Sequence, residues 1–181
     1  MKIEKALFAP GKSAFYFDDQ DAIKRGARRD GFVYEGEPVT AGFRRVRQAG
    51  ESISVVFVLQ DGSFAEGDCA ACQYSGAGGR APLFLAEEYI PFLEERVKPL
   101  LEGRELGTFR EMSEWVDGLE VDGRRLHSGL RYGLSQALLE ARATVDGRLK
   151  VEVICDEYDL PVVARRLPIF GQTGDHRYEG V

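Results

Sequence analysis

The sequence has no long hydrophobic run, few cysteines and no excess of positive charge. No window approaches the roughly 18 apolar residues of a membrane-spanning helix, so none is expected. Lysine and arginine total 24 against 30 acidic residues, and this balance argues against nucleic acid, whose phosphates favour a basic surface. Three cysteines and no apolar leader point to the cytoplasm. The 181 residues are typical of one globular domain, or of one domain and part of another.

The first half of the sequence predicts strands. Residues 2–9 have strand character, which Pro10 and Gly11 are expected to end. The stretch 15–36 is interpreted mostly as loop with one short helix.

The clearest hairpin pairs residues 52–60 with 63–70. The Asp61-Gly62 pair between them favours a type I′ turn, in which both central residues need positive φ.

Three helices are expected after the hairpin. The first, at 84–101, has an apolar face formed by Leu85, Tyr89, Phe92, Leu93, Val97 and Leu100, and Pro91 is expected to kink or interrupt it by removing a hydrogen bond. The second begins at a capping box, Thr108 to Glu111, and turns Phe109, Met112, Trp115 or Val116, and Leu119 inward. The third, at 126–143, sets four leucines four residues apart beside a row of small residues that would admit another backbone: Gly129, Gly133, Ala137 and Ala141.

Residues 165–172 are typical of a short buried strand that ends at Gln172. A lone strand leaves its backbone groups unpaired. It therefore either joins the earlier sheet or starts a second domain.

Few residues predict chemistry by themselves. Cys69 and Cys72 have the spacing of a redox dithiol or half a metal site, but no second pair follows, so buried or incidental cysteines are favoured. His127 and His176 lack a nucleophile signature and are interpreted as structural or solvated. The acidic pairs Asp18-Asp19 and Asp156-Glu157 are interpreted as a solvated loop or helix end, and the basic clusters at 25–29 and 44–47 as solvated faces.

The Gly-rich segment 75–80 follows a strand, and its amides could surround an anion. Its spacing alone favours a tight loop. Gln73 and Tyr74, at the end of the preceding strand, are polar groups placed where ligand contacts tend to gather.

Four segments in order resemble the methylaspartate ammonia-lyase (3-methylaspartase) family of the enolase superfamily, and the resemblance runs from Met1 to the tail. They are residues 15–20, 46–55, 67–80 and 125–133. One departure is Cys72, where the family pattern has an aliphatic residue, so the Cys-x-x-Cys spacing looks incidental.

The resemblance implies an α+β fold. Residues 1–160 would form an enolase-type N-terminal capping domain, an antiparallel β-meander followed by helices. Residues 161–181 would begin a TIM-like β/α barrel, of which this sequence holds only the first strand.

The resemblance also implies a carbon-nitrogen lyase that eliminates ammonia from L-threo-3-methylaspartate to give mesaconate, with Mg²⁺ and K⁺, as a homodimer. The base and the metal ligands would lie in the missing barrel, so this chain alone is expected to be inactive, with no catalytic or metal-binding residue of its own. Gln172 would contact a substrate carboxylate and Gln73 the amino group. The loop residues that would shield the site from water are Tyr74, Ser75, Gly76, Gly78 and Gly79.

Two alternatives stay open. The chain could be a non-catalytic assembly or ligand-binding module derived from the capping domain, or part of another superfamily member such as a dehydratase or racemase. An apolar strand at 167–170 argues against a free-standing module, because exposed strands invite aggregation.

Overall fold

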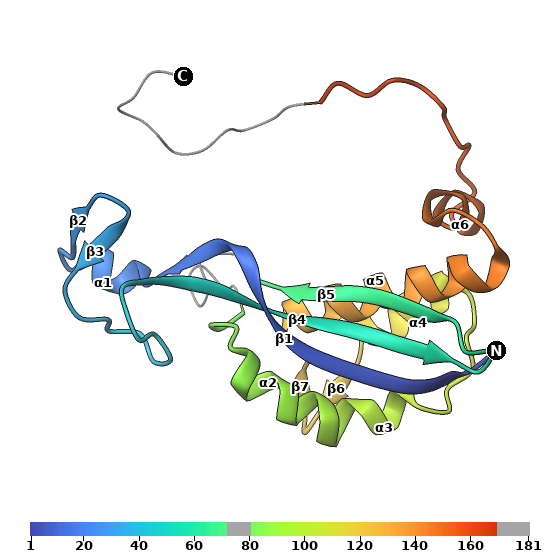
Figure 1. Cartoon of the computed structure of the whole chain (residues 1–181), viewed down its shortest axis with the longest axis horizontal. Helices are drawn as coiled ribbons and strands as arrows, with labels where there is room; N and C mark the ends of the chain where they lie inside the picture. The colour runs from blue at the N-terminus through green and yellow to red at the C-terminus, as the bar shows by residue number, and fades with distance from the viewer. Residues whose placement is uncertain (72–80, 170–181) are drawn as a thin grey trace.

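In the computed structural model of this chain, residues 1–71 and 81–169 are described, apart from the side chain of Ala14. Their central feature is an antiparallel sheet with the strand order β1-β4-β5 (Figure 1). The strands are β1 (Ile3–Asp18), β4 (Arg47–Leu59) and β5 (Phe64–Ala70). Alternate residues of β4 from Ile53 to Leu59 are fully buried, as the period of a strand with one covered face requires.

The predicted hairpin is confirmed, but its predicted turn type is wrong. Of the two central residues only Gly62 has a positive φ, +85°. The Gly62 N–H donates to the Leu59 carbonyl at 2.9 Å, and the Leu59 N–H donates to the Ser63 carbonyl at 2.7 Å. This is a tight turn followed by one left-handed residue, a connection one residue longer than a type I′ turn.

The predicted end of the first strand is also wrong, because β1 continues through Pro10 and Gly11. Pro10 pairs with Ile53 and Gly11 with Ser52. β1 lies at the edge of the sheet, where a missing proline N–H breaks no ladder. Gly11 suits this position because a Cβ there would lie 2.7 Å from Ser52 Oγ.

An arm extends from the sheet between β1 and β4 (Figure 1). It contains the expected short helix, α1 (Gln20–Lys24), and a small hairpin of β2 (Arg28–Asp30) and β3 (Val33–Glu35) that the sequence did not predict. Charged residues hold the arm. Asp18 accepts two hydrogen bonds from the Arg47 guanidinium, at 2.6 and 2.8 Å, and Arg47 also donates to the Phe32 carbonyl.

Asp19, which is fully buried, ties the arm together. One of its oxygens accepts the N–H groups of Val39 and Thr40, and the other accepts the Thr40 hydroxyl and the Ala22 N–H. Burial acts to raise the pKa of Asp19, but these hydrogen bonds outweigh burial and hold the pKa below its usual 3.8.

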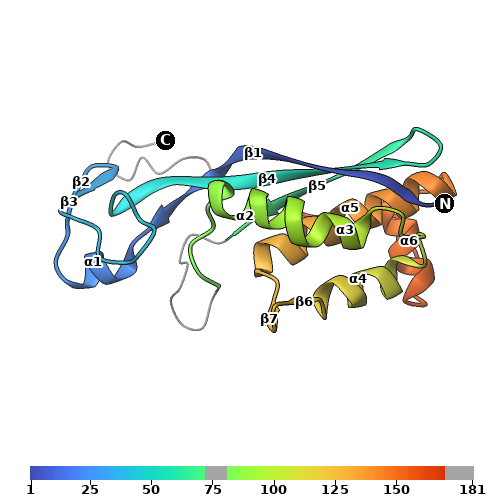
Figure 2. The same ribbon diagram turned by 90° about the horizontal axis from the view of Figure 1, so that it is seen from below.

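The helices that follow β5 lie on one side of the sheet (Figure 2). They are α2 (Ala86–Phe92), the π-helical turn η1 (Leu93–Val97), α3 (Lys98–Leu101), α4 (Phe109–Asp117), α5 (Ser128–Asp146) and α6 (Lys150–Glu157), with the short pair β6 (Glu120–Val121) and β7 (Arg124–Arg125) between α4 and α5. The Thr108–Glu111 capping box is present, and Met112 and Val116 are buried as expected.

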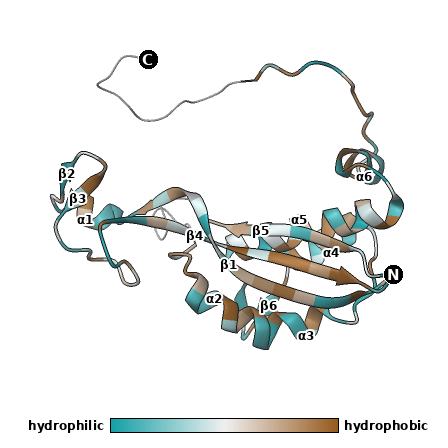
Figure 3. Cartoon of the chain, viewed as in Figure 1, coloured by the Kyte–Doolittle hydropathy of each residue, from teal (hydrophilic) through white to brown (hydrophobic). Residues whose placement is uncertain are grey.

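The first predicted helix is interrupted just after Pro91, and its apolar face changes as a result. Leu93 and Val97 are buried, but Leu100 is exposed and Leu101 takes the expected buried place. The wider π-helical turn of η1 explains the change, because it brings residues four apart onto one line. Hydrophobic and hydrophilic bands alternate along α2 and α3 in Figure 3, as expected for helices with one buried side.

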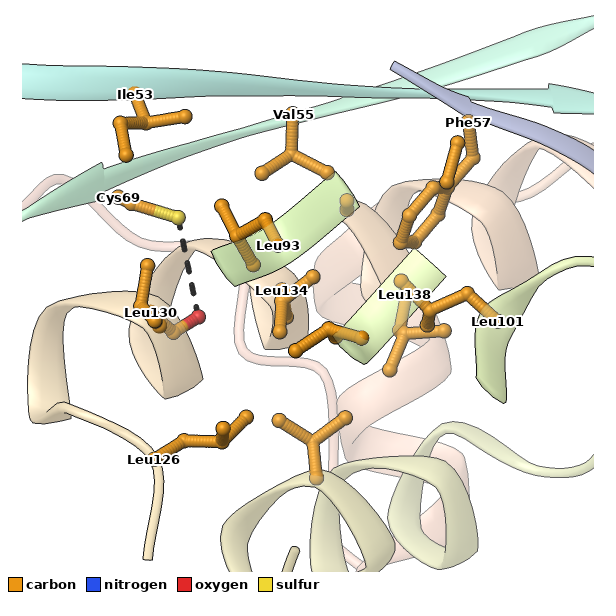
Figure 4. Packing of buried hydrophobic residues seen from close by; sticks show 14 of the residues in the cluster. Ile53, Val55, Phe57, Cys69, Leu93, Leu101, Leu126, Leu130, Leu134 and Leu138 are labelled. Atoms are coloured by element: carbon orange, nitrogen blue, oxygen red, sulfur yellow. Dashed lines mark hydrogen bonds between the residues drawn. The ribbon is translucent and has the colours of Figure 1, made fainter. Parts of the chain in front are cut away.

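The core lies between the sheet and α5 (Figure 4). The four predicted leucines, Leu126, Leu130, Leu134 and Leu138, are buried. The predicted row of small residues faces β5, where the two backbones approach directly. A Cβ on Gly133 would contact Cys69 and the Asp68 carbonyl carbon, and a Cβ on Gly67 would contact the backbone of Gly133 and Ala137.

The strand predicted at 165–172 is absent from its described part. Residues 159–169 form neither helix nor strand and run away from the body (Figure 1). Ile169 is 95% exposed. A strand needs a neighbour to pair its backbone, and no described strand lies beside this segment. Among the described residues, no helix is long and apolar enough to cross a membrane.

The close approach of α5 and β5 predicts a large effect of one methyl group. Gly133→Ala should lower the free energy of unfolding by about 1–3 kcal/mol or more, because backbone atoms of β5 cannot move aside cheaply. The change in the free energy of unfolding is measured by urea denaturation, with circular dichroism as the signal. Gly118→Ala is the control: φ there is −87° and the nearest atom to a Cβ is 3.4 Å away, so a change within about 0.5 kcal/mol is expected. Equal losses in the two variants would contradict the close packing.

Asp19 predicts an acid-sensitive arm. Asp19→Asn should destabilise the chain by about 1–3 kcal/mol at pH 7, because an amide places a donor against N–H groups that need acceptors. Because the native pKa of Asp19 lies below 3.8, the ionised carboxylate contributes its full stabilisation at pH values above 3.8. That stabilisation is lost as the pH falls through the native pKa. Urea midpoints between pH 7 and 3 should therefore fall more steeply in the parent chain than in the variant. Parallel pH profiles would exclude this role.

Candidate functional site

The predicted binding residues lie outside the described residues. Gln73 and the shielding residues Tyr74, Ser75, Gly76, Gly78 and Gly79 fall within 72–80, and Gln172 falls within 170–181. Their assigned roles therefore stay predictions. The structure describes the chain that flanks 72–80 on both sides. This flanking chain, together with the residues that bind it, is called the frame.

The frame joins the end of β5 to the start of α2. From residue 81 the chain continues through Leu83, Phe84 and Leu85, and all three side chains are buried. The first amide of α2, Ala86 N–H, donates to Oε2 of Glu51 on β4 at 2.7 Å. The carboxylate of a neighbouring strand thus caps this helix, which fixes its position against the sheet.

His127 lies at the centre of the frame, 8% exposed, as the N-cap of α5. Its Nδ1 accepts the Gly129 N–H at 2.9 Å, and its Nε2 lies 2.9 Å from the Pro82 carbonyl oxygen. Burial lowers the pKa of His127, and the positive charge of Arg131 acts in the same direction against the hydrogen bond to Pro82. This geometry agrees with the structural interpretation of His127. His176 lies outside the described residues.

Cys69 belongs to the core and not to a reactive site. Its side chain is fully buried, and its Sγ lies 3.8 Å from the Leu130 carbonyl oxygen (Figure 4). Burial, with a smaller contribution from Asp68, raises the pKa of the Cys69 thiol to about 12. A thiol that stays protonated at neutral pH is a poor nucleophile and a poor metal ligand. Cys72 lies outside the described residues.

The prediction that the acidic pairs are solvated is wrong for Asp18 and Asp19, which are 4% and 0% exposed, and members of both pairs serve the fold. Asp18 and Asp19 hold the arm, and Asp156 pairs with Arg148. Glu157 accepts the first two amides of α4, from Phe109 at 2.8 Å and Arg110 at 2.6 Å. Nothing in the local sequence marks Glu157 as a cap, because its partner helix begins nearly fifty residues earlier.

The described residues do not fit a metal ion. None of them form a group of three or more His, Cys, Asp or Glu side chains that could ligate one. The basic clusters lie at the surface except for Arg47, whose side chain is only 16% exposed and pairs with Asp18. Arg28 and Arg44 are ion-paired at the surface, with Glu35 and Glu87. Neither set of charged residues forms a catalytic constellation.

Among the grooves on the described surface, three open ones have volumes between about 350 and 590 Å³. The groove between α4 and α5 has a volume of about 540 Å³ and is lined by Glu114, Asp117, Arg131 and Tyr132, with Asp117 already paired to Arg131. Two more, of about 590 and 350 Å³, share Lys12 and Glu51. The larger of these two reaches the frame at Glu51 and Ala86, and none of the three is lined by His127, Leu83, Phe84 or Leu85.

Comparison with known proteins is informative over the whole chain. Residues 1–159 match the family model described as the methylaspartate ammonia-lyase N-terminus. The chain is 60% identical over 181 residues to methylaspartate ammonia-lyase of Citrobacter amalonaticus, covering 100% of this chain and 44% of that protein.

Solved structures agree. The Citrobacter amalonaticus enzyme containing (2S,3S)-3-methylaspartic acid superposes with a TM-score of 0.92 at 61% identity, and the beta-methylaspartase of Clostridium tetanomorphum in a Mg complex with a TM-score of 0.92 at 54% identity. Each comparison covers 98% of this chain and 43% of the other.

The likeness confirms both the expected α+β fold and the resemblance drawn from the sequence motifs. The chain spans less than half the length of the relatives that it matches. It belongs to the methylaspartate ammonia-lyase family and corresponds to the N-terminal part of its members.

Proposed function

We propose that this chain is the capping region of a methylaspartate ammonia-lyase, and that the whole enzyme converts L-threo-3-methylaspartate into mesaconate and ammonia. One observation carries the proposal. The chain is 61% identical, over nearly all its residues, to a protein solved with (2S,3S)-3-methylaspartic acid, and it shares that protein's fold.

In the proposed reaction, a base removes the proton from the carbon that bears the methyl group. The electron pair forms the carbon-carbon double bond while the carbon-nitrogen bond breaks and ammonia leaves. The proposal places the base outside this chain, in a β/α barrel whose first strand begins within residues 161–181, with the cap formed by residues 1–160. The end of the family match at residue 159 and the exposed apolar residues that follow support this boundary.

This chain would contribute two amides. The Gln172 side-chain N–H₂ would donate to a substrate carboxylate without adding charge. The Gln73 carbonyl would accept from the substrate ammonium. An amide suits that place better than a carboxylate would, because a leaving group should be oriented without being held tightly. Tyr74, Ser75, Gly76, Gly78 and Gly79 would shield the site from water.

The proposal includes Mg²⁺, K⁺ and a cytoplasmic homodimer. The Mg complex of the Clostridium tetanomorphum relative supports the magnesium. Because the described residues form no metal cluster, the ligands are assigned to the barrel.

The proposal predicts activity by complementation. This chain should form no mesaconate alone from 3-methylaspartate with Mg²⁺ and K⁺, but it should do so when mixed with the barrel half of the Citrobacter amalonaticus enzyme. Alkene absorbance follows the product. Gln73→Ala and Gln172→Ala should each lower kcat/KM of the mixture by about 10- to 100-fold, since each removes a hydrogen bond to a charged group.

Gln60→Ala is the matched control, because Gln60 is an exposed glutamine at the β4–β5 turn and should leave kcat/KM unchanged. Size-exclusion chromatography establishes that the halves associate. An inactive mixture of folded, associated halves would overturn the proposal and favour a non-catalytic module. Full activity of both glutamine variants would overturn the two assigned contacts.

A further inference from the structure

The strand β4 is apolar on both of its sides. From Ile53 to Leu59 it has no charged side chain, and Val56 and Val58 stand at positions that alternate with the buried ones. A strand with one face in water usually carries polar residues at such positions, whereas a nearly continuous apolar run is typical of a strand covered on both faces. The helices that follow β5 lie on only one side of this sheet (Figure 2). The sequence of β4 therefore indicates a second covering layer on the other side.

The neighbouring strands extend this apolar surface. Leu7 on β1 pairs with Val56, and Phe64 on β5 pairs with Val58. Residues directly opposite each other in an antiparallel pair point to the same face of the sheet, so these four side chains form one patch, here called the open face. Leu7 is 46% exposed and Phe64 is 63% exposed. A contiguous exposed apolar patch of this kind marks a surface that binds another macromolecule.

The edges of the sheet are less suited to a partner than the open face. On β1 the Ala6 N–H already donates to the Glu102 carboxylate at 3.1 Å, and on β5 the Asp68 N–H donates to the Gln136 side chain at 3.2 Å. An added strand would need these backbone groups for its own ladder. The open face is thus the part of the sheet on which a partner can pack.

Two opposite charges lie at the two sides of the open face. Lys5 on β1 and Glu66 on β5 point outward with the patch, because they pair with Val58 and Val56 of β4. Both are exposed, and within the described part of the chain neither is ion-paired. The open face therefore has an apolar centre, a positive side and a negative side.

A second copy of the chain has the complementary arrangement. A two-fold axis parallel to β4, midway between two facing sheets, places β1 of each copy over β5 of the other. Lys5 of each copy then lies beside Phe64 and Glu66 of the second copy. Because every contact in such an interface occurs twice, two ion pairs border one apolar centre. Two sheets pack face to face in this way when their strands run within about 30° of each other.

We propose that the open face is the interface through which two copies of this chain associate, with Lys5 of each copy paired to Glu66 of the other. This inference rests on the proposed function for the homodimer, and it names the surface that joins the two copies. Burial of Leu7, Val56 and Phe64 drives the association, whereas the two ion pairs determine its orientation.

Charge reversal tests the pairing. In sedimentation equilibrium this chain should be a dimer at about 100 μM, where even a micromolar interface is occupied. Lys5→Glu and Glu66→Lys should each raise the Kd of the dimer by about tenfold or more, because each replaces two ion pairs by two contacts between like charges. The double variant exchanges the charges and should return Kd to within about threefold of the parent value. Glu120→Lys is the control, because it reverses an exposed charge on β6, on the helical side of the sheet (Figure 2).

Removal of one ring tests the apolar centre. Phe64→Ser should raise Kd by about tenfold or more, because the two-fold axis makes it remove two phenyl rings from the interface. Phe32→Ser is the matched control, because Phe32 is 51% exposed and lies on the arm, outside the open face. It should leave Kd unchanged. Phe64 is exposed in the single chain, so its variant should keep the parent's urea midpoint.

Several outcomes would overturn the inference. They are a monomeric parent chain, a dimer that neither charge reversal weakens, and a loss in the single variants that the double variant does not restore. Two copies should also stay together when each binds the barrel half of the Citrobacter amalonaticus enzyme. Separation of the copies on addition of that half would assign the open face to the barrel instead. Because association is measured without substrate, an inactive mixture would overturn the proposed reaction and leave this inference standing.

Discussion

The direct contact between the backbones of α5 and β5 is the constraint on which the rest of this fold depends. Gly67 on the strand and Gly133 on the helix leave no room for a Cβ, so the two elements pack closer than side chains would allow. That approach sets the leucines of α5 beneath the sheet, where they meet Ile53, Val55 and Phe57 (Figure 4). It also places the first turn of α5 at the end of β5, and hence His127 beside the chain that returns through Pro82.

Charged residues in this domain are used mainly as structural ligands for backbone amides. Asp19 binds the amides of Val39 and Thr40, Glu51 caps α2, and Glu157 caps α4. A buried or partly buried carboxylate is stable only when its oxygens are satisfied, and these oxygens are. An acidic composition therefore gives no metal site in the described residues, although the family to which the chain belongs includes a protein solved with magnesium.

The residues that the sequence motifs assign to the site and the residues that the structure describes around it are different sets. The predicted chemical roles fall within 72–80 and at Gln172, whereas the described residues form the packed backbone on either side of 72–80. His127 has no signature of catalysis in the sequence, and its neighbours are Phe84 and Tyr89, which only folding brings to it.

The sequence by itself determined the β4–β5 hairpin, the leucine period of α5, the capping box at Thr108, the small-residue row of α5 and the family. These are local patterns or long motifs, so no distant contact was needed to read them. Tertiary structure alone decided that β1 continues past Pro10, that Leu101 replaces Leu100 in the core, and that residues 165–169 form no strand. Each of these depends on what lies beside the segment in space: an edge that tolerates proline, a widened helical turn, and a neighbouring strand to pair with.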